Sequence, residues 1–178
     1  MRKILLDRNP HLDALRVGCR HMKPGQSTRM SIHHHDCSEI AVILHGGAAV
    51  HWVQGQPCPL NRGDVLLMHP GTSHMYGDPD NLELVNLLYE ADRLPLPPLD
   101  GGEMKLFRAF CDPQWRAPHP EEPLVRLSEA DLDRLGPLLA LLEEEIGAAD
   151  LGQHLCVFGL FVAVLVLLAR AGGIPLIT

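Results

Sequence analysis

The sequence predicts a mainly β fold, a barrel or a sandwich, followed by an antiparallel helical hairpin. Three observations predict it. Short apolar runs alternate with turn residues from about residue 12 to 90, a proline-rich stretch covers 91–127, and two helical periodicities lie between 128 and 171. About seven short strands with no helix between them are typical of a β-sandwich or a β-barrel. The 178 residues suffice for one such domain with an appendage.

Clear turn signals separate the expected strands. Pro24-Gly25, Gly46-Gly47 and Pro70-Gly71 interrupt the apolar runs, and glycine allows the positive φ that hairpin turns require. The candidate strands are Arg16–His21, Thr28–His35, Glu39–His45, Ala48–Gln54, Asp64–His69, His74–Tyr76 and Leu82–Glu90.

Seven prolines between residues 91 and 127 exclude long regular elements there, so we expect a connector with one short helix around Met104–Cys111. The run Ser128-Glu129-Ala130-Asp131 resembles a capping box in which aspartate replaces glutamate, and it predicts the start of the first long helix. One face of that helix is apolar at three- and four-residue steps, at Leu132, Leu135, Leu139, Leu142 and Ile146.

Gly147 is expected to end the first helix, and Asp150 is expected to cap the second. The second helix runs to about Ala171, where Gly172-Gly173-Ile174-Pro175 stops it. Its stretch Leu155 to Ala169 holds fifteen residues without a charge. About 20 are needed to cross a bilayer, so we expect a subunit interface and no membrane contact.

Charge excludes one class of function, and cysteine usage indicates the redox compartment. The formal net charge is −7 and the 15 lysines and arginines are scattered, whereas direct nucleic-acid binding needs a basic face. The five cysteines form no C-x-x-C pair and indicate free thiols in a reducing compartment. Because the N-terminus does not resemble a signal peptide, we expect a cytoplasmic location.

A histidine-rich segment carries the chemistry. Side chains alternate along a strand, so His33, His35 and Glu39 are expected to share one face, with His74 added from a later strand. Such a group could hold a divalent transition metal (Zn, Ni, Fe or Mn) or grip a small polar ligand. Trp52 is a weaker candidate, since an aromatic ring at a barrel mouth can stack on a carbohydrate. His34, His45 and His51 are expected to face outward or to lie at the rim.

Two spaced motifs strengthen this hypothesis. The first is H-x-H, three residues, Glu39, then six residues to Gly46; the second is Gly63, six residues, Pro70-Gly71, two residues, His74. Together they resemble the two motifs of the cupin superfamily, which implies a double-stranded β-helix barrel. The resemblance implies that His33, His35, Glu39 and His74 are metal ligands. The sequence departs from the motifs at Ser27, His69 and Asp78, where glycine, proline and asparagine are expected.

Longer stretches resemble a narrower family, the N-terminal sensor domain of AraC-type transcription regulators, and in particular its rhamnose-responsive members. These stretches are His33–Ile40, His51–Pro57, Gly63–His74 and Leu84–Tyr89. The resemblance implies that a barrel at 1–90 binds a small effector, often a sugar, through His33, His35, Glu39, His74 and Trp52. It also implies that the hairpin at 128–171 forms a homodimer and that a helix-turn-helix DNA-binding domain, absent from this chain, follows it. The chain is then either an excised sensor domain or a stand-alone barrel, and Gly172-Gly173-Ile174-Pro175 favours the former, because 172–178 resembles the start of an interdomain linker.

The sequence thus leaves two functions open. The favoured one is a non-catalytic effector-sensing and dimerisation domain. The alternative is a metal-dependent cupin enzyme, an oxygenase or an isomerase, in which the same four side chains hold the metal. The altered second motif and the apolar terminal helix favour the sensor.

Overall fold

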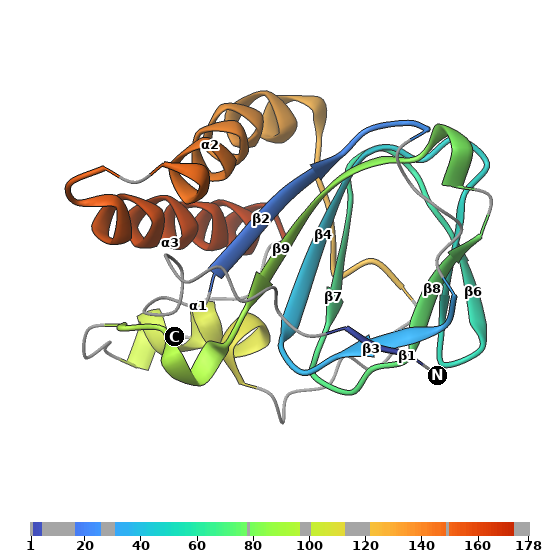
Figure 1. Cartoon of the computed structure of the whole chain (residues 1–178), viewed down its shortest axis with the longest axis horizontal. Coiled ribbons are helices and arrows are strands. Elements are labelled where there is room, and N and C mark those ends of the chain that lie inside the picture. Colours follow the sequence, from blue (N-terminus) through green and yellow to red (C-terminus); the bar gives the residue numbers. More distant parts are fainter. Residues whose placement is uncertain are drawn as a thin grey trace.

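A computed structural model describes residues 2–4, 17–25, 31–77, 79–96, 101–112, 122–148 and 150–172 of the chain. Ten strands form two five-stranded sheets that face one another, and helices pack on the outer face of one of them (Figure 1). The first sheet has the order β1 (Arg2–Ile4), β3 (His33–His35), β8 (His74–Gly77), β5 (Val50–Val53), β6 (Gln56–Pro59). The second has the order β10 (Val125–Arg126), β7 (Asp64–Met68), β4 (Ser38–His45), β9 (Glu83–Tyr89), β2 (Val17–Met22).

The strand order is that of a double-sheet jelly roll. Strands 2-9-4-7 lie in one sheet and strands 3-8-5-6 in the other, so the chain crosses between the sheets as two Greek keys do. All pairings within these two groups are antiparallel, and only β1 pairs in parallel, with β3. The predicted mainly β barrel of the cupin type is therefore confirmed.

The seven expected strands match β2, β3, β4, β5, β7, β8 and β9, although residues 26–30 at the start of the expected strand Thr28–His35 lie outside the described residues. Three described strands were not expected, and the first of them is β1, at residues 2–4. In β6, Pro57 and Pro59 hide the strand pattern, and proline is tolerated there because β6 lies at the edge of its sheet. The two-residue strand β10 lies inside the expected connector and pairs with β7.

Strand β4 is buried on both faces and separates two cores. Ile40 and Val42 face the helices, whereas Ala41 and Ile43 pack with residues inside the barrel. A helical layer covers the sheet that contains β2 and β9 (Figure 1). It consists of α1 (Gly101–Cys111), α2 (Glu129–Gly147) and α3 (Gln153–Ala171). In the described part of the chain, α3 is the one helix long and apolar enough to cross a membrane, and its buried side chains pack into the helix–sheet core.

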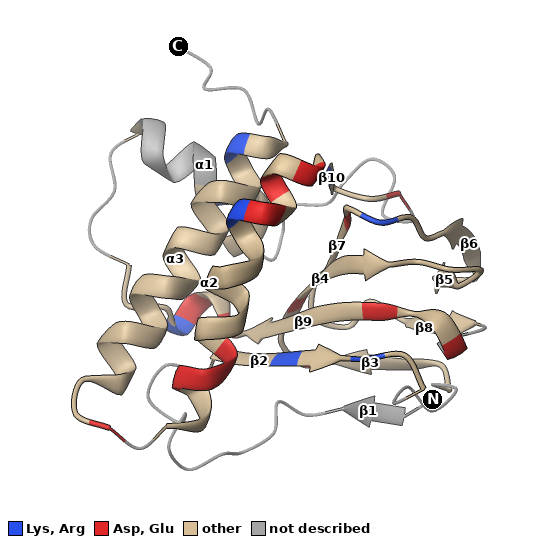
Figure 2. Ribbon diagram, turned by 90° about the horizontal axis from the view of Figure 1, so that it is seen from above, with Lys and Arg blue, Asp and Glu red and all other residues tan. Residues whose placement is uncertain are grey.

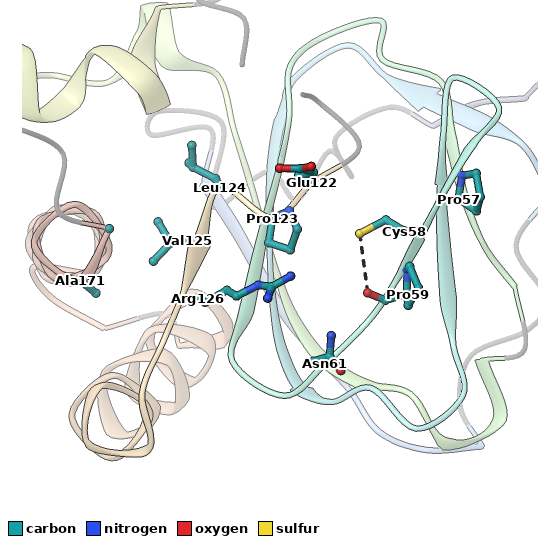
Figure 3. Close-up of a pocket in the computed structure, with 11 residues that line it drawn as sticks. Pro57, Cys58, Pro59, Asn61, Glu122, Pro123, Leu124, Val125, Arg126 and Ala171 are labelled. Carbon is teal, nitrogen blue, oxygen red and sulfur yellow. Dashed lines mark hydrogen bonds between the residues drawn. The ribbon is translucent and has the colours of Figure 1, made fainter. Parts of the chain in front are cut away.

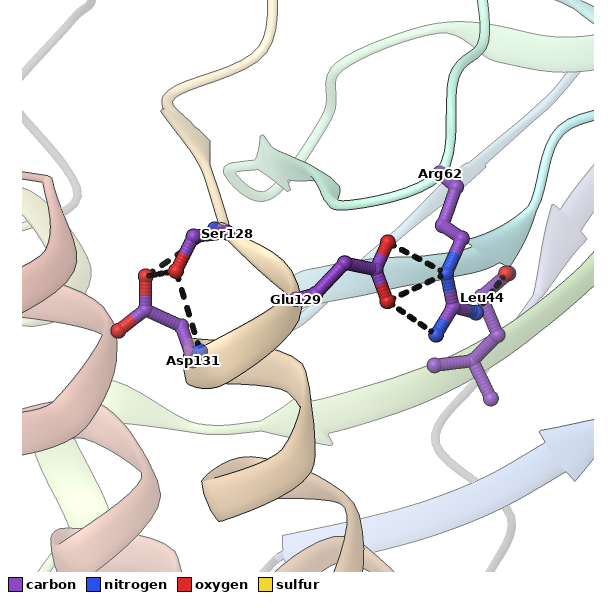
Figure 4. Close-up of polar contacts among 5 residues, drawn as sticks. All are labelled: Leu44, Arg62, Ser128, Glu129 and Asp131. Carbon is purple, nitrogen blue, oxygen red and sulfur yellow. Dashed lines mark hydrogen bonds and ion pairs between the residues drawn. The ribbon is translucent and has the colours of Figure 1, made fainter.

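The two long helices begin by different means. Ser128 and Asp131 form the expected reciprocal capping box: the Asp131 amide donates to the Ser128 hydroxyl, and the Ser128 amide donates to the Asp131 carboxylate (Figure 4). The expectation that Asp150 caps the second helix is wrong, because α3 has Gly152 at its N-cap, with φ 84°. Gln153 instead donates its side-chain amide to the carbonyl oxygens of Glu145 (2.8 Å), Ile146 and Ala148, which closes the corner of the hairpin.

The turn at residues 61–63 connects the barrel to the start of α2. The Arg62 guanidinium donates to both carboxylate oxygens of Glu129 and to the Leu44 carbonyl oxygen (Figure 4). The Leu127 amide donates to the Gly63 carbonyl oxygen at 2.8 Å. Gly63 has φ 88°, and a Cβ at this position would lie 2.4 Å from the Leu127 carbonyl oxygen. Only glycine fits this contact between barrel and hairpin.

A pair of glycine substitutions tests that contact. Gly63→Ala introduces both a left-handed strain of about 1–2 kcal/mol and a clash with the Leu127 carbonyl. Gly55→Ala introduces the strain alone, because nothing lies within 4 Å of the added Cβ at φ 87°. We expect urea denaturation to show a clearly larger loss of unfolding free energy for Gly63→Ala, by at least about 1 kcal/mol. Equal losses would mean that the approach of Leu127 to Gly63 does not restrict this turn.

A histidine–glutamate cluster in the barrel

Three strands bring the expected ligand residues together. His33 in β3 lies directly opposite His74 in β8, and His35 follows two residues later on the same face. The chain then bends at Asp36-Cys37 and enters the other sheet, where Glu39 is the second residue of β4. Glu39 therefore reaches the two histidines from the facing sheet, because the two separate strands expected here belong to different sheets.

The four side chains converge inside the barrel. One ring nitrogen from each of His33, His35 and His74 lies within 4.8 Å of the others. The Glu39 carboxylate oxygen Oε2 lies 2.8 Å from His35 Nε2 and 3.4 Å from His74 Nε2. All four residues are buried. We call these four residues the histidine–glutamate cluster.

Backbone carbonyls set the tautomers of two of the histidines. His33 Nδ1 lies 2.9 Å from the Ser31 carbonyl oxygen, and His74 Nδ1 lies 3.2 Å from that of Thr72. A carbonyl oxygen only accepts, so each Nδ1 carries the proton and each Nε2 keeps a lone pair when the ring is neutral. Metal-binding histidines are oriented in this way by their second nitrogen.

Burial and mutual contact decide the charges of the cluster. Burial opposes ionisation of Glu39, yet its contacts with His35 and His74 outweigh this and hold the pKa of the carboxyl well below its usual range. The same contact with Glu39 overcomes the effect of burial on His74 and raises its pKa. Burial lowers the pKa of His33, which favours its neutral form.

These residues fit a divalent transition metal. Three imidazoles and one carboxylate are common ligands of Fe, Mn, Ni and Zn in proteins. Each imidazole must be neutral to bind the metal. His35 Nε2, His74 Nε2 and Glu39 Oε2 are buried and have no well-directed hydrogen bond within the described part of the chain. The cluster therefore offers metal-ligating atoms whose contacts within the described residues are only with one another.

Strand β5 presents His51 to the interior and Trp52 to the other side. Residues alternate along β5, with His51 and Val53 buried and Trp52 half-buried. His51 is 1% exposed, and its ring lies 5.4 Å from that of His74. The expectation that His51 lies outward or at the rim is therefore wrong, and the structure does not bring Trp52 together with the other expected pocket residues. His34 is half-buried and His45 is exposed.

A cavity of about 750 Å³ lies elsewhere, between β6, residues 122–126 and the end of α3 (Figure 3). Its polar lining includes Arg126, whose Nε lies 3.3 Å from the buried carboxylate of Asp64. A smaller cavity of about 180 Å³ lies between α2 and α3. Neither cavity is lined by a residue of the histidine–glutamate cluster.

A jelly-roll barrel that buries such a cluster and carries a helical hairpin on one sheet defines a ligand- or metal-binding barrel domain. The chain belongs to the family of AraC-like ligand binding domains, whose sequence pattern matches residues 17–149. It is 30% identical to the HTH-type transcriptional activator RhaR of Mannheimia succiniciproducens over 152 residues, which are 85% of this chain and 49% of that protein. It is 30% identical to the HTH-type transcriptional activator RhaS of Escherichia coli, over 78% of this chain and 47% of that protein.

The chain thus spans about half the length of these curated relatives. Among solved structures, a predicted oxalate decarboxylase of Thermotoga maritima is 26% identical, with a TM-score of 0.36, over 48% of this chain and 75% of that chain. A salicylate 1,2-dioxygenase of Pseudoaminobacter salicylatoxidans is 20% identical, with a TM-score of 0.35, over 72% of this chain and 41% of that chain.

The buried His51 predicts an acid sensitivity of the fold. Burial, and then the neighbouring His74, lower the pKa of His51 to about 3, against about 6.5 in an unfolded chain. Between these values the unfolded chain binds a proton that the folded chain does not, so stability falls as the pH falls below about 6.5. When the pH is lowered from 7 to 5, the unfolding free energy of the parent is expected to fall. That of His51→Phe is expected to fall by about 2 kcal/mol less.

Urea denaturation at both pH values measures this difference. The raised pKa of His74 has the opposite effect on the unfolding free energy, because the stability that it contributes is lost as the pH rises. His74 is present in both proteins, so this effect cancels in the comparison. His45→Asn, at an exposed histidine, is the matched control and is expected to follow the parent. If the parent and His51→Phe weaken equally on acidification, the neutral buried imidazole does not carry the effect.

Proposed function

We propose that this chain is the effector-sensing and dimerisation domain of an AraC-type transcription regulator and acts in the cytoplasm. The observation that carries the proposal is the family match over residues 17–149, together with relatives that are named transcriptional activators. In this proposal a small molecule, a sugar in the first instance, binds inside the barrel against His33, His35, Glu39 and His74.

Effector binding can act on the rest of the molecule through β4. Glu39 belongs to the ligand cluster, while the next residue, Ile40, packs into the core shared with α2 and α3. A ligand that binds one arrangement of this strand more tightly shifts the population toward it. In the proposed regulator, a shift of β4 at Glu39 would therefore also move Ile40 against the helical layer.

DNA contact is assigned to a separate domain, outside this chain. The described lysines and arginines are scattered over several elements and lie among acidic residues (Figure 2). A net charge of −7 repels the phosphate backbone. The barrel and hairpin then act on DNA only through what they are joined to, as the half-length match to the relatives supports.

The proposed homodimer forms through the helical hairpin, with α3 as its main contact. Leu155 in α3 is 79% exposed and Leu151, in the corner before it, is 105% exposed, which leaves apolar surface available to a second copy. The partly buried residues Phe158, Val162 and Val166 follow Leu155 at three- and four-residue steps and continue this surface along α3. A second copy that covers this face gives a two-fold symmetric dimer.

Leu155→Asp tests the dimer. The side chain is largely exposed in one copy, so the fold is expected to persist while a charge enters the proposed interface. Sedimentation velocity is expected to show a dimer for the parent chain and a shift of at least about tenfold in the dissociation constant for the variant. Ala140→Asp, at an exposed position of α2, is the control. A parent chain that sediments as a soluble monomer contradicts the assembly.

The second candidate function is a metal-dependent enzyme, and the three imidazole nitrogens within 4.8 Å of one another favour it. His33, His35, Glu39 and His74 would hold the metal. The bound ion would supply Lewis-acid or redox chemistry. In that case the protein supplies the neutral imidazoles, the carboxylate and the enclosure of the barrel.

One experiment separates the two functions. Protein prepared without an affinity tag is assayed for metal content and then unfolded thermally against a library of sugars and other small metabolites. The sensor predicts a ligand that raises Tm by about 5–10 °C at 100 times its Kd, with no turnover, and loss of that shift in His74→Ala. Metal near one equivalent per chain, with turnover of a ligand and loss of both in His74→Ala, supports the enzyme and contradicts the sensor.

A further inference from the structure

Two further polar side chains lie beside the histidine–glutamate cluster without a role in it. His51 in β5 and Tyr76 in β8 are register partners, and their rings stack with centroids 4.8 Å apart and an interplanar angle of 25°. They are 1% and 2% exposed. His51 also lies next to His74, with ring centroids 5.4 Å apart. Both side chains therefore lie in the buried interior of the barrel, on the sheet that also carries His33, His35 and His74.

Their polar atoms have no partner in the described part of the chain. Both ring nitrogens of His51 and the hydroxyl of Tyr76 are buried without a hydrogen bond. Proteins rarely leave such atoms unsatisfied, because desolvation is not compensated. The other fully buried tyrosine differs, since Tyr89 donates to the Phe110 carbonyl oxygen at 2.5 Å. Both tyrosines are buried, but only the Tyr76 hydroxyl has no hydrogen bond among the described residues. A polar ligand beside His51 and Tyr76 would supply the missing hydrogen bonds.

The chemistry of these atoms selects the ligand. A neutral imidazole offers one donor and one acceptor, and a phenol hydroxyl also does both. Hydroxyl groups are complementary to this set, because each can donate and accept. No lysine or arginine is buried among the described residues, and His35 and His74 already contact the Glu39 carboxylate, so an anionic ligand would find no unpaired cation there. Tyr76 also packs in an apolar cluster with Leu66 and Met68, which suits the C–H face of a sugar ring.

We infer that His51 and Tyr76 form a second polar subsite, adjacent to the histidine–glutamate cluster, that binds the hydroxyl groups of an uncharged polyhydroxyl ligand. The inference rests on the proposed effector-binding function and deepens it, because it assigns the ligand class and two residues that select it. The cluster holds one part of the ligand, and the stacked His51–Tyr76 pair recognises hydroxyl groups on the next part.

The test uses Tyr76→Phe in the whole chain, with Met75→Leu as the matched control on the opposite face of the same strand. The ligand panel comprises neutral sugars (L-rhamnose, L-fucose and D-mannose), a sugar acid (D-galacturonate) and a sugar phosphate (D-glucose 6-phosphate). Thermal unfolding gives the Tm of each protein with and without ligand, and calorimetry gives Kd for each compound that raises Tm.

We expect at least one neutral sugar, and neither anion, to stabilise the parent. Tyr76→Phe is expected to keep or raise the Tm of the free protein, because it removes an unsatisfied buried hydroxyl, and to weaken sugar binding about 5- to 30-fold. Met75→Leu is expected to bind like the parent. His51→Phe is expected to weaken binding as well, which provides a second variant if Tyr76→Phe does not fold.

Each other outcome overturns a defined part. If the parent, Tyr76→Phe and His51→Phe bind the sugar with equal affinity, the inferred subsite is contradicted and the proposed function is not. Stabilisation by the acid or the phosphate alone removes the ligand class and again leaves effector binding intact. A clear fall in the Tm of free Tyr76→Phe means that the hydroxyl has a structural role, which contradicts the subsite. Failure of every compound to stabilise the parent contradicts both the subsite and a sugar effector.

Discussion

The contact of the Glu39 carboxylate with His35 and His74 is the interaction around which the barrel is organised. Glu39 comes from one sheet and the two histidines from the other, so this contact joins the two halves of the jelly roll at their interior. A buried carboxylate without partners would be strongly destabilising. The bend at Asp36-Cys37 makes the contact possible, because it carries the chain from β3 into β4 within two residues.

The same strand relates the interior of the barrel to the helical layer. Successive residues of β4 face opposite ways, so the ligand cluster and the helix–sheet core are one residue apart in the chain. A second connection runs through the turn at residues 61–63, which contacts Leu127, just before the hairpin, and Glu129, in its first turn. The hairpin thus packs along the sheet and also contacts the barrel near the start of α2. A structural change inside the barrel can therefore reach the hairpin through β4 or through the turn at residues 61–63.

Sensor and enzyme make the same demand on this interior, which explains why one set of residues serves both hypotheses. Each requires imidazoles whose rings are held in a fixed orientation, and backbone carbonyls that accept from Nδ1 provide this for His33 and His74. The two hypotheses differ in what binds the Nε2 atoms of these histidines. In the enzyme it is a metal ion, and in the sensor it is a polar molecule. The unsatisfied atoms of His51 and Tyr76 extend the polar surface beyond the reach of a single ion, which favours a molecule.

The sequence by itself determined the mainly β fold, the two long helices, the capping box at Ser128 and the four cluster residues, because local periodicity, turn residues and motif spacing are written in the chain order. Only the tertiary structure decided which face of β5 points inward, since alternation separates His51 from Trp52 but does not say which of the two is buried. It also decided that β10 pairs with β7 and that Gln153, not Asp150, closes the helical corner. These features depend on partners far along the chain or on backbone carbonyls, and neither leaves a signal in local sequence.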